Sequence, residues 1–421
     1  MLLCWTLKEG EEANRIFSFY SLAIQTKEDL KDNLLGELKY KSGEIMNKIK
    51  YALIGCGRIS HKHVDALVAN KDEVEAIAFV DVMKERASQR AEEYKKKMKE
   101  HGIIVNPEVF DDYFSMISSV KPDLVAIATE SGYHPKIAID CLNSKINVIC
   151  EKPMALSIKD ANDMIEASIR NDKKLAVCFQ NRFNKTIALA RKALEEKRFG
   201  RILNVTSTIR WNRSMDYYKQ APWRGTWRLD GGTLMNQCTH NIDLLQWFLG
   251  GRIIEVFGFT SRFVKQIEAE DFGAAIVKSD NGAIGIIEGS ANVFPENLEE
   301  TLFISGTTGT VKIGGLAVNK IETWRFLDQN IRGDTEEKVT SESYSLSNDF
   351  QGVYGYGHAP LYHDMVLSIK ENRKPYIDGV EGKKALEIIL SIYKSQKTGK
   401  PICLPLKNFS TLEMDDKLLG H

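Results

Sequence analysis

The chain has 421 residues, more than one hydrophobic core usually serves, and 43% of them are hydrophobic, so two domains are expected. Lys plus Arg and Asp plus Glu each number 57, which gives a formal net charge of zero. This balance argues against nucleic acid or an anionic membrane surface as the main partner and favours a small ligand.

Residues 1–45 form an extension with only a weak helical pattern, ahead of a clear strand that begins near Lys48. The codons for Gly43 and Glu44 can spell a purine-rich ribosome-binding site just before Met46. We hypothesise that translation begins at Met46. N-terminal mass analysis of the natural protein tests this, because detection of residues 1–45 would exclude it.

The cysteine pattern and the lack of long apolar runs indicate the cellular compartment. The seven cysteines are an odd number with no C-x-x-C pair, which favours a reduced cytoplasm. No stretch approaches the roughly 18 consecutive apolar residues that a membrane-spanning helix requires, and residues 1–7 are too poorly flanked for a signal peptide. We therefore predict a cytoplasmic protein with no membrane partner.

Residues 46–172 are expected to form a first domain in which apolar strands alternate with helices. Strands are predicted from YALIG at 51–55, VEAIAFVD at 74–81, LVAIAT at 124–129 and NVIC at 147–150, and helices near 61–70 and at 84–100. Runs rich in Val and Ile are typical of strands buried on both faces of a parallel sheet. The pattern predicts an α/β Rossmann fold with a doubly wound parallel sheet.

A glycine-rich turn follows the first strand and opens the first helix. Gly55-Cys56-Gly57-Arg58-Ile59-Ser60 gives the pattern G-x-G-x-x-S, in which the small Ser60 replaces a third glycine. Glycines let backbone amides approach a pyrophosphate at the helix N-terminus, where the helix dipole favours negative charge. The motif alone is weak, because such turns are common. In this context it makes Gly55, Gly57, Arg58 and Ile59 candidate cofactor contacts.

Asp81 ends the second strand. In dinucleotide-binding folds a carboxylate roughly 20 residues after the glycines accepts hydrogen bonds from the adenosine ribose, and Asp81 lies close to that spacing. Its charge would repel a 2′-phosphate, and the next residue is Val82 rather than Arg. Lys84 and Arg86 are better explained as a solvated helix face than as phosphate ligands. The combination favours NAD over NADP.

Glu151-Lys152-Pro153 follows the strand that ends at Cys150. This places Lys152 beyond the carboxyl end of the parallel sheet, where open α/β folds bind their ligands. Taken alone, such a lysine is better explained as a surface charge beside a proline turn. The rest of the chain is needed to favour a catalytic role.

Residues 173–406 are expected to form a second, α+β domain, because the alternation of strand and helix stops after the strand at 175–181. A helix is predicted at 186–197, followed by strand segments at 202–211, 253–263, 271–293 and 300–315, with the turn signal Asp280-Asn281-Gly282. These segments predict a large, mostly antiparallel open sheet. Residues 407–421 are left as a tail.

A helix is predicted from Thr233 to Leu249, with two distinct faces. At 100° per residue, an apolar side gathers toward the core; it consists of Leu234, Cys238, Ile242, Leu245 and Leu249. The other side carries Asn236, His240, Asp243 and Trp247. Because this side lacks the long Lys and Glu residues usual toward solvent, we interpret it as the wall of a cleft.

If a nicotinamide cofactor accepts a hydride from an alcohol, the hydroxyl group must also lose its proton. A histidine that titrates near neutral pH suits that proton, and His240 is the candidate. His61-Lys62-His63 could indicate a metal site, but no third ligand lies nearby in the sequence. No metal is expected.

Further motifs occur in a characteristic order. The glycine turn is followed by Ala128-Thr129-Glu130-Ser131-Gly132-Tyr133-His134, Glu151-Lys152-Pro153, Gly231 to Asp243, Gly306-Thr307-Thr308-Gly309-Thr310 and Gly357-His358. With these motifs in register, residues from about Lys48 to about Leu406 resemble the glucose-fructose oxidoreductase, inositol dehydrogenase and rhizopine-catabolism (Gfo/Idh/MocA) family.

The resemblance implies NAD as the cofactor and a role for each motif. Lys152 would contact the reacting hydroxyl and the nicotinamide ribose, with the Lys152–Pro153 bond in cis; His240 would be the catalytic histidine, and Asp243 would orient the substrate or that histidine. Cofactor contacts are also implied for Thr129, His134 and Glu151, and sugar contacts for Gln180, Arg182, Asn236 and His240. A structural turn explains Gln180 and Arg182 equally well, and His63 is expected to pack rather than bind.

The sequence departs from the family pattern at two places. The usual Pro-Asn after the threonine is Glu130-Ser131 here, which leaves the individual contacts of that loop open. The family often has Asp at the position of Asn236. Because an amide cannot act as a base, we assign proton transfer to Lys152 and His240.

The expected activity is NAD-dependent hydride transfer at a secondary alcohol of a sugar or sugar nucleotide. Asn236-Gln237-x-x-His240, together with Gly355-Tyr356-Gly357-His358, resembles dehydrogenases that act at C3 of a UDP-N-acetyl-aminoglucuronate. An inositol or free-sugar dehydrogenase is the alternative, and a non-catalytic NAD-binding redox sensor is a second one. The family further implies a homodimer or homotetramer built on one face of the second sheet.

Overall fold

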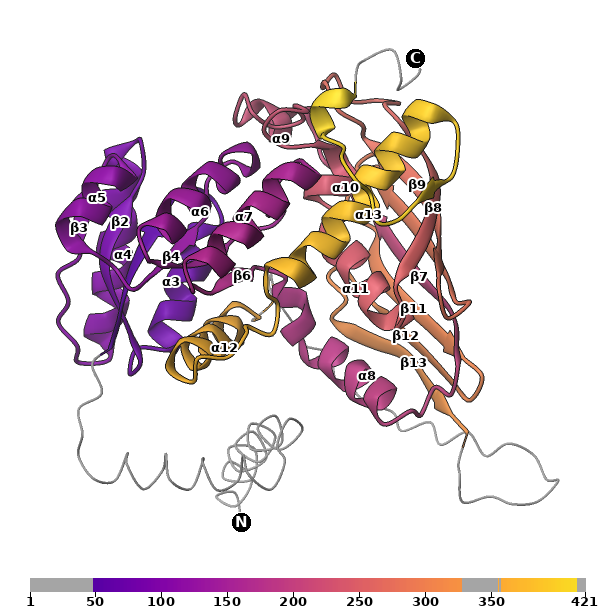
Figure 1. Ribbon diagram of the computed structural model, residues 1–421, viewed down its shortest axis with the longest axis horizontal. Helices are drawn as coiled ribbons and strands as arrows, with labels where there is room; N and C mark the ends of the chain where they lie inside the picture. Colours follow the sequence, from indigo (N-terminus) through magenta and orange to yellow (C-terminus); the bar gives the residue numbers. More distant parts are fainter. Residues whose placement is uncertain (1–47, 328–354, 356, 415–421) are drawn as a thin grey trace. The chain divides into compact units, whose positions relative to one another are not determined.

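The computed structural model describes residues 48–327, 355 and 357–414. The expected extension at 1–45, the hypothesised start at Met46 and residues 415–421 of the tail lie outside this part of the chain. From Ile49 onward the described residues build two sheets with helices packed against them (Figure 1). Within the described residues, no helix combines the length and apolar character needed to cross a membrane.

The first sheet has six parallel strands in the order β3-β2-β1-β4-β5-β6. Their bounds are β1 Ile49–Ile54, β2 Val74–Val80, β3 Glu108–Phe110, β4 Leu124–Ile127, β5 Asn147–Cys150 and β6 Leu175–Val177. Every residue of β4 and β5 is buried, as their Val- and Ile-rich sequences predict. The Rossmann prediction is confirmed, and the strand order reverses between β1 and β4, where such sheets bind their ligands.

Helices link these strands and cover the sheet. They are α3 Ser60–Ala69, α4 Lys84–Glu100, α5 Tyr113–Val120, α6 His134–Asn143 and α7 Ile158–Arg170. Two of them start at a side-chain cap: Asp112 accepts from the first amides of α5, and Ser157 accepts from the amide of Asp160 in α7. A helix from the far end of the chain, α12 (His358–Lys370), packs against α3.

The second sheet has eight strands in the order β13-β12-β11-β7-β10-β9-β8-β14. Their bounds are β7 Ile202–Arg210, β8 Ile253–Ser261, β9 Phe272–Ser279, β10 Ile284–Ser290, β11 Glu299–Gly306, β12 Gly309–Gly314, β13 Lys320–Phe326 and β14 Ile402–Cys403. Only β7 and β10 pair in parallel; the other neighbours run antiparallel. The expected mostly antiparallel open sheet is therefore confirmed.

Among the described residues, helices cover one face of this sheet and leave the other face open. The remaining helices are α8 Lys185–Glu195, α9 Met215–Lys219, α10 Gly232–Asn236, α11 Thr239–Leu249 and α13 Gly379–Thr398. Figure 1 shows α10, α11 and α13 along the covered face, in agreement with their contacts. On the other face Phe259, Ile276 and Ile286 are exposed.

Two boundaries differ from the expectation. β6 pairs with β5 in the first sheet, although its residues lie beyond the expected domain boundary after 172. The helix expected from Thr233 to Leu249 is two helices, because the amides of Gln237 and Cys238 both donate to the carbonyl oxygen of Thr233, at 2.8 and 3.1 Å. The apolar residues predicted for its inner side are all buried.

Candidate active site

The glycine turn lies between β1 and α3, at the carboxyl end of the parallel sheet. Gly55 has a φ of +95°, and a Cβ there would lie 2.5 Å from the carbonyl carbon of Ala128. No heavy atom lies within 4 Å of a Cβ built on Gly57, and Arg58 and Ile59 follow as exposed and half-buried residues. The fold therefore requires the first glycine, whereas the second leaves space for a ligand at the start of α3.

Asp81 lies beside this turn, just after β2. One carboxylate oxygen accepts a hydrogen bond from the amide of Cys56 at 2.8 Å, and the other accepts from the amide of Met83 at 2.9 Å. These bonds fix the carboxylate next to the glycines. Each oxygen keeps a second acceptor site, so ribose hydroxyls can still donate to Asp81.

The loop after β4 is tied to the Lys152–Pro153 peptide, which is cis, as the resemblance implied. The ring of His134 is buried and contacts two carbonyl oxygens, that of Pro153 through Nδ1 at 2.9 Å and that of Thr129 through Nε2 at 3.0 Å. Both ring nitrogens are thus engaged by the backbone. The cofactor contact of His134 stays a prediction, and the geometry favours an indirect role in holding Thr129.

Lys152 follows β5 and reaches across to the second domain. Its Nζ donates a hydrogen bond to the main-chain oxygen of Asn236 at 2.9 Å. In an unbroken helix that oxygen would accept from the amide of His240, so the break between α10 and α11 makes it available. Burial lowers the pKa of Lys152, although the charges of Glu151 and Asp230 oppose this. Lys152 therefore releases a proton more readily than an ordinary lysine.

His240 lies in the first turn of α11, close to Lys152. Its Nε2 lies 3.3 Å from Nε2 of Gln180, and its Nδ1 is buried with no hydrogen-bond partner. Burial lowers the pKa of His240 well below its usual value, and the charge of Lys152 lowers it further. Because the side-chain nitrogen of Gln180 can only donate, Nε2 of a neutral His240 is the acceptor and Nδ1 carries the proton. Nε2 is therefore the atom that can take up a proton once Gln180 moves away.

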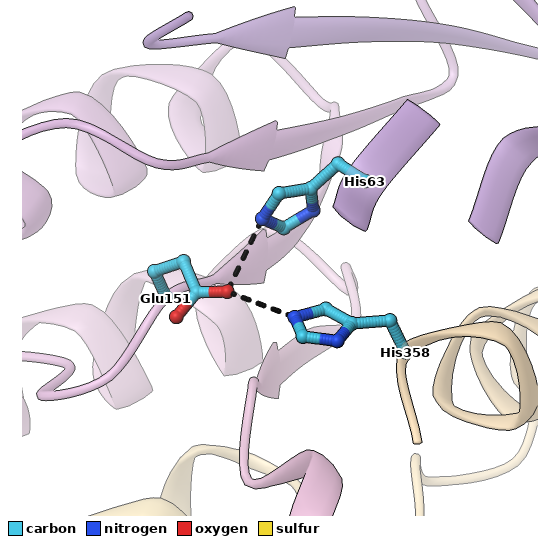
Figure 2. A group of neighbouring side chains, drawn as sticks. All are labelled: His63, Glu151 and His358. Carbon is cyan, nitrogen blue, oxygen red and sulfur yellow. Dashed lines mark hydrogen bonds and ion pairs between the residues drawn. The ribbon is translucent and has the colours of Figure 1, made fainter. Parts of the chain in front are cut away.

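Glu151 lies at the centre of a cluster of buried side chains, which Figure 2 shows. Its Oε1 lies 3.1 Å from Nε2 of His63 on α3 and 3.5 Å from Nε2 of His358 on α12. Its Oε2 accepts from the amide of Lys152 at 3.2 Å. The sequence predicts only packing for His63, and no spacing in it links either histidine to Glu151.

Asp243 and Arg182 form a buried ion pair. Nε and Nη2 of Arg182 donate to the two oxygens of Asp243 at 2.7 and 2.6 Å, and Nη1 donates to Glu381 at 3.2 Å. Both side chains are 1% exposed, and neither ring nitrogen of His240 bonds to Asp243. The direct roles predicted for Arg182 and Asp243 stay predictions. In the geometry described, their ion pair links α11 to the Gln180–Phe183 turn.

Two buried carboxyl groups near Lys152 were missed by the sequence analysis. Asp230 accepts from the side-chain amide of Asn236 and from the amide of Gly225, and burial raises its pKa. Glu300, on β11, is 2% exposed, and burial raises its pKa to about 8 against the charges of Arg213 and Lys152. Neither residue belongs to a motif or a periodic pattern that could have marked it.

The assembled geometry defines a class of protein. A glycine turn of the kind that binds dinucleotides, with a fixed carboxylate beside it, lies at the switch point of the parallel sheet. Lys152 bonds to the main chain of Asn236 and lies near a neutral His240. When bound, NAD accepts a hydride, and the paired basic groups can hold the proton that must leave with it. The chain has the architecture of a two-domain nicotinamide-dependent oxidoreductase.

Comparison with known families agrees with this class. Residues 49–179 match the model described as "Oxidoreductase family, NAD-binding Rossmann fold", and residues 187–312 match the "GFO/IDH/MocA C-terminal domain". The protein belongs to the Gfo/Idh/MocA family and is an NAD-dependent sugar or polyol dehydrogenase acting on CH–OH groups. The expectation of NAD as the cofactor is confirmed.

Individual relatives cover nearly the whole described chain. The WlbA dehydrogenase from Bordetella pertussis, solved with NADH and UDP-GlcNAcA, is 34% identical, with a TM-score of 0.73 over 86% of this chain and 100% of that one. The WlbA enzyme from Chromobacterium violaceum, with the same ligands, is 35% identical, with a TM-score of 0.73 over 86% and 97%. Myo-inositol 2-dehydrogenase from Thermotoga maritima is 25% identical over 85% of this chain and 98% of its own.

Proposed function

We propose that the protein transfers a hydride between NAD and C3 of a UDP-linked N-acetyl-aminoglucuronate. The observation that carries this proposal is the identity of 34% and 35% to two enzymes solved with NADH and UDP-GlcNAcA. The inositol 2-dehydrogenase relative reaches 25%. The sequence Asn236-Gln237-x-x-His240 supports the same substrate class.

The surroundings of Gln237 suit a polar, anionic substrate. Its side-chain oxygen accepts from Nε of Arg213 at 3.0 Å, and its side-chain nitrogen donates to the hydroxyl of Tyr217 at 3.0 Å. Nη1 of Arg224 donates to the same hydroxyl at 2.5 Å. Two guanidinium groups thus stand in one network next to Asn236, where they can attract the carboxylate or the diphosphate of a sugar nucleotide.

In the proposed reaction each residue near the reacting carbon has one task. His240 accepts the hydroxyl proton through Nε2 once the substrate displaces the side-chain nitrogen of Gln180, because Nδ1 of the neutral ring carries the proton when Nε2 accepts from Gln180. Lys152 donates a hydrogen bond to the same oxygen and stabilises the alkoxide character that develops there. The amide of Asn236 binds the sugar and takes no part in proton transfer.

Arg182 and Asp243 support this arrangement from behind. Their paired hydrogen bonds and the stacking of Arg182 on Trp247, at 4.7 Å from the ring centroid, hold α11 in place. We therefore assign them to positioning His240 and Gln180 rather than to direct contact with the substrate.

The substrate is tested by the absorbance of reduced nicotinamide with a matched panel. UDP-GlcNAcA is compared with UDP-GlcNAc, which lacks the carboxylate, and with myo-inositol and free sugars. We expect kcat/KM to be highest for UDP-GlcNAcA and to fall at least about 100-fold without its carboxylate, which corresponds to the loss of charge-assisted hydrogen bonds to that group. A higher kcat/KM for myo-inositol would favour the alternative, and NAD binding without any turnover would favour a redox sensor.

We also propose that the uncovered face of the second sheet binds a second copy of this chain. Phe257, Ile276 and Ile286 are neighbours across β8, β9 and β10, and the latter two are 55% and 42% exposed. A flat, apolar row of this kind is typical of an interface between identical subunits. Sedimentation should show a dimer or tetramer, and Ile276→Asp should shift it to smaller species; a monomeric wild type would contradict the proposal.

A further inference from the structure

The buried cluster around Glu151 is not explained by cofactor binding or by the proposed proton transfer. It consists of His63, Glu151, His358 and Tyr362, all at most 6% exposed. Two imidazoles converge on the same carboxylate oxygen, from α3 and from α12, as Figure 2 shows. Elements from both ends of the described chain are therefore fixed to the residue just before Lys152.

The position of His63 is set by a second contact. Its Nδ1 lies 2.6 Å from the hydroxyl of Tyr362, which in turn lies 2.7 Å from the hydroxyl of Tyr51 on β1. If Tyr362 donates to Nδ1, the proton of a neutral His63 is on Nε2 and points at Glu151. The chain of hydroxyls thus presents an N–H donor to the carboxylate, and the amide of Lys152 supplies another to Oε2.

Protonation of both Lys152 and His240 during the reaction would place two positive charges close together, and the charge of Glu151 in this cluster can offset them. If His240 takes the substrate proton, an imidazolium forms near the ammonium of Lys152, in a site largely removed from water. Two like charges in such a place destabilise each other. Asn236 is an amide and cannot offset them. The charges of Glu151 and Asp230 both act on Lys152, and that of Glu151 also acts on His240.

We propose that Glu151 is the counter-ion of the Lys152 and His240 pair, a carboxylate that the imidazoles of His63 and His358 hold in place and keep ionised. The proposal rests on the roles of Lys152 and His240 given above. Glu151 acts through these two residues, so it is a positioning residue and not a catalytic one. His63 and His358 support it in turn.

The direction of each pKa agrees with this role. Burial by itself would raise the pKa of Glu151, but contacts from His358 and His63 hold it well below the usual value. The charge of Glu151 in turn raises the pKa of both Lys152 and His240 against the effect of burial. The titratable groups that face Glu151 from the surrounding elements are Tyr51, His63, His134, Cys150, Lys152, Cys178, His240, His358 and Tyr362.

A hydrogen bond from His63 and a charge contact from His358 to Glu151 account for the spacing of the cluster. One potential metal-ligand atom from each of His63, Glu151 and His358 lies within 4.8 Å of the others. At this separation the three atoms could also hold a divalent cation. Such a cation would stand next to the ammonium of Lys152, which repels it. We therefore assign the cluster to charge compensation, and metal content becomes an outcome of the test.

Glu151→Gln tests the proposal because it keeps the shape of the side chain and removes its charge. The pKa of Lys152 can be read without any substrate, from the pH dependence of its acylation by an amine reagent, followed on the tryptic peptide by mass spectrometry. Loss of the anion should move the midpoint down by about one pH unit. The acidic limb of the kcat profile should move in the same direction, and kcat should fall about 100-fold, with the Kd of NADH within about twofold of wild type.

Tyr51→Phe is the matched control. It removes the last hydroxyl in the series that runs from His63 through Tyr362 to Tyr51, and it leaves Glu151 unchanged. It should leave the Lys152 midpoint and kcat close to wild type. His358→Gln should give an intermediate shift, and it replaces Glu151→Gln if thermal unfolding shows that the latter does not fold.

Three results would overturn the proposal. They are an unchanged Lys152 midpoint in folded Glu151→Gln, a loss of NADH affinity as its main defect, and a stoichiometric metal ion that His63→Ala releases. The acylation readout keeps this test separate from the proposed substrate. If the wild type does not turn over UDP-GlcNAcA but the Lys152 midpoint is shifted in Glu151→Gln, only the proposed substrate is refuted.

Discussion

The two glycines of the cofactor turn should respond to the same substitution in opposite ways. Alanine at Gly55 would place its Cβ 2.5 Å from the Ala128 carbonyl carbon with φ at +95°. The left-handed backbone costs about 1–2 kcal/mol and the clash adds a similar amount, so the free energy of unfolding should fall by about 2–4 kcal/mol. Alanine at Gly57 meets no atom within 4 Å, so it should change the stability by less than about 1 kcal/mol.

Gly57→Ala should weaken the binding of NADH although it leaves the stability almost unchanged. If the pyrophosphate lies over Gly57, the added methyl occupies its space, and the Kd should rise about 10- to 100-fold, or about 1.4–2.8 kcal/mol. Urea unfolding without cofactor gives the stability, and quenching of protein fluorescence by NADH gives the Kd. A Gly57→Ala variant with normal stability and normal NADH affinity would refute the placement of the pyrophosphate at this turn.

Three further predictions concern the second domain. His240→Asn should lower kcat about 100- to 10,000-fold with little change in the Kd of NADH; steady-state rates and cofactor titration check this, and near-normal turnover would end the assignment. The raised pKa of Glu300, about 8 against an ordinary 4.5, means that the stability it contributes is full below about pH 4.5 and is lost as the pH rises through about 8. Glu300→Gln should remove this decline, on the order of 5 kcal/mol, in urea unfolding across pH, and an unchanged slope would argue against a buried neutral carboxyl. Asp243→Asn leaves the charge of Arg182 without its main partner and should cost about 3–5 kcal/mol of stability, whereas the double variant Asp243→Leu with Arg182→Met should lose less.

Local patterns were sufficient for much of the first domain. α4 begins and ends at the predicted residues, Lys84 and Glu100, because its charged, periodic sequence ends at His101 and Gly102. β4 and β5 followed from apolar runs that only a sheet buried on both faces can accommodate. The turn between β9 and β10 also lies at the expected Asp280-Asn281-Gly282, where Gly282 has a φ of +85°.

Contacts between distant residues were not available from the sequence. Glu151 meets His358 from α12, and no spacing rule links two residues so far apart. The side chain of Asp230 bonds to that of Asn236, and the break between α10 and α11 frees the main-chain oxygen of Asn236 for Lys152. An uninterrupted periodic pattern gave no sign of that break.

The polar residues predicted to share one helix face are divided between two helices. Asn236 on α10 and His240 on α11 both lie near Lys152, and the cleft wall stays a prediction. Asp243 shares their spacing but is 1% exposed and paired with Arg182. Helical spacing places residues on one side of a helix, whereas the partner that each one meets depends on packing from other elements.

Transfer of an isotopic label tests the central claim most directly. UDP-GlcNAcA carrying deuterium at C3 is incubated with NAD and the enzyme, and the reduced nicotinamide is analysed by NMR. The account predicts one deuterium at C4 of the nicotinamide for each sugar oxidised, and none with Lys152→Met or His240→Asn on the same timescale. Reduced cofactor without deuterium, or no reduction at all by a protein that binds NADH, would contradict it.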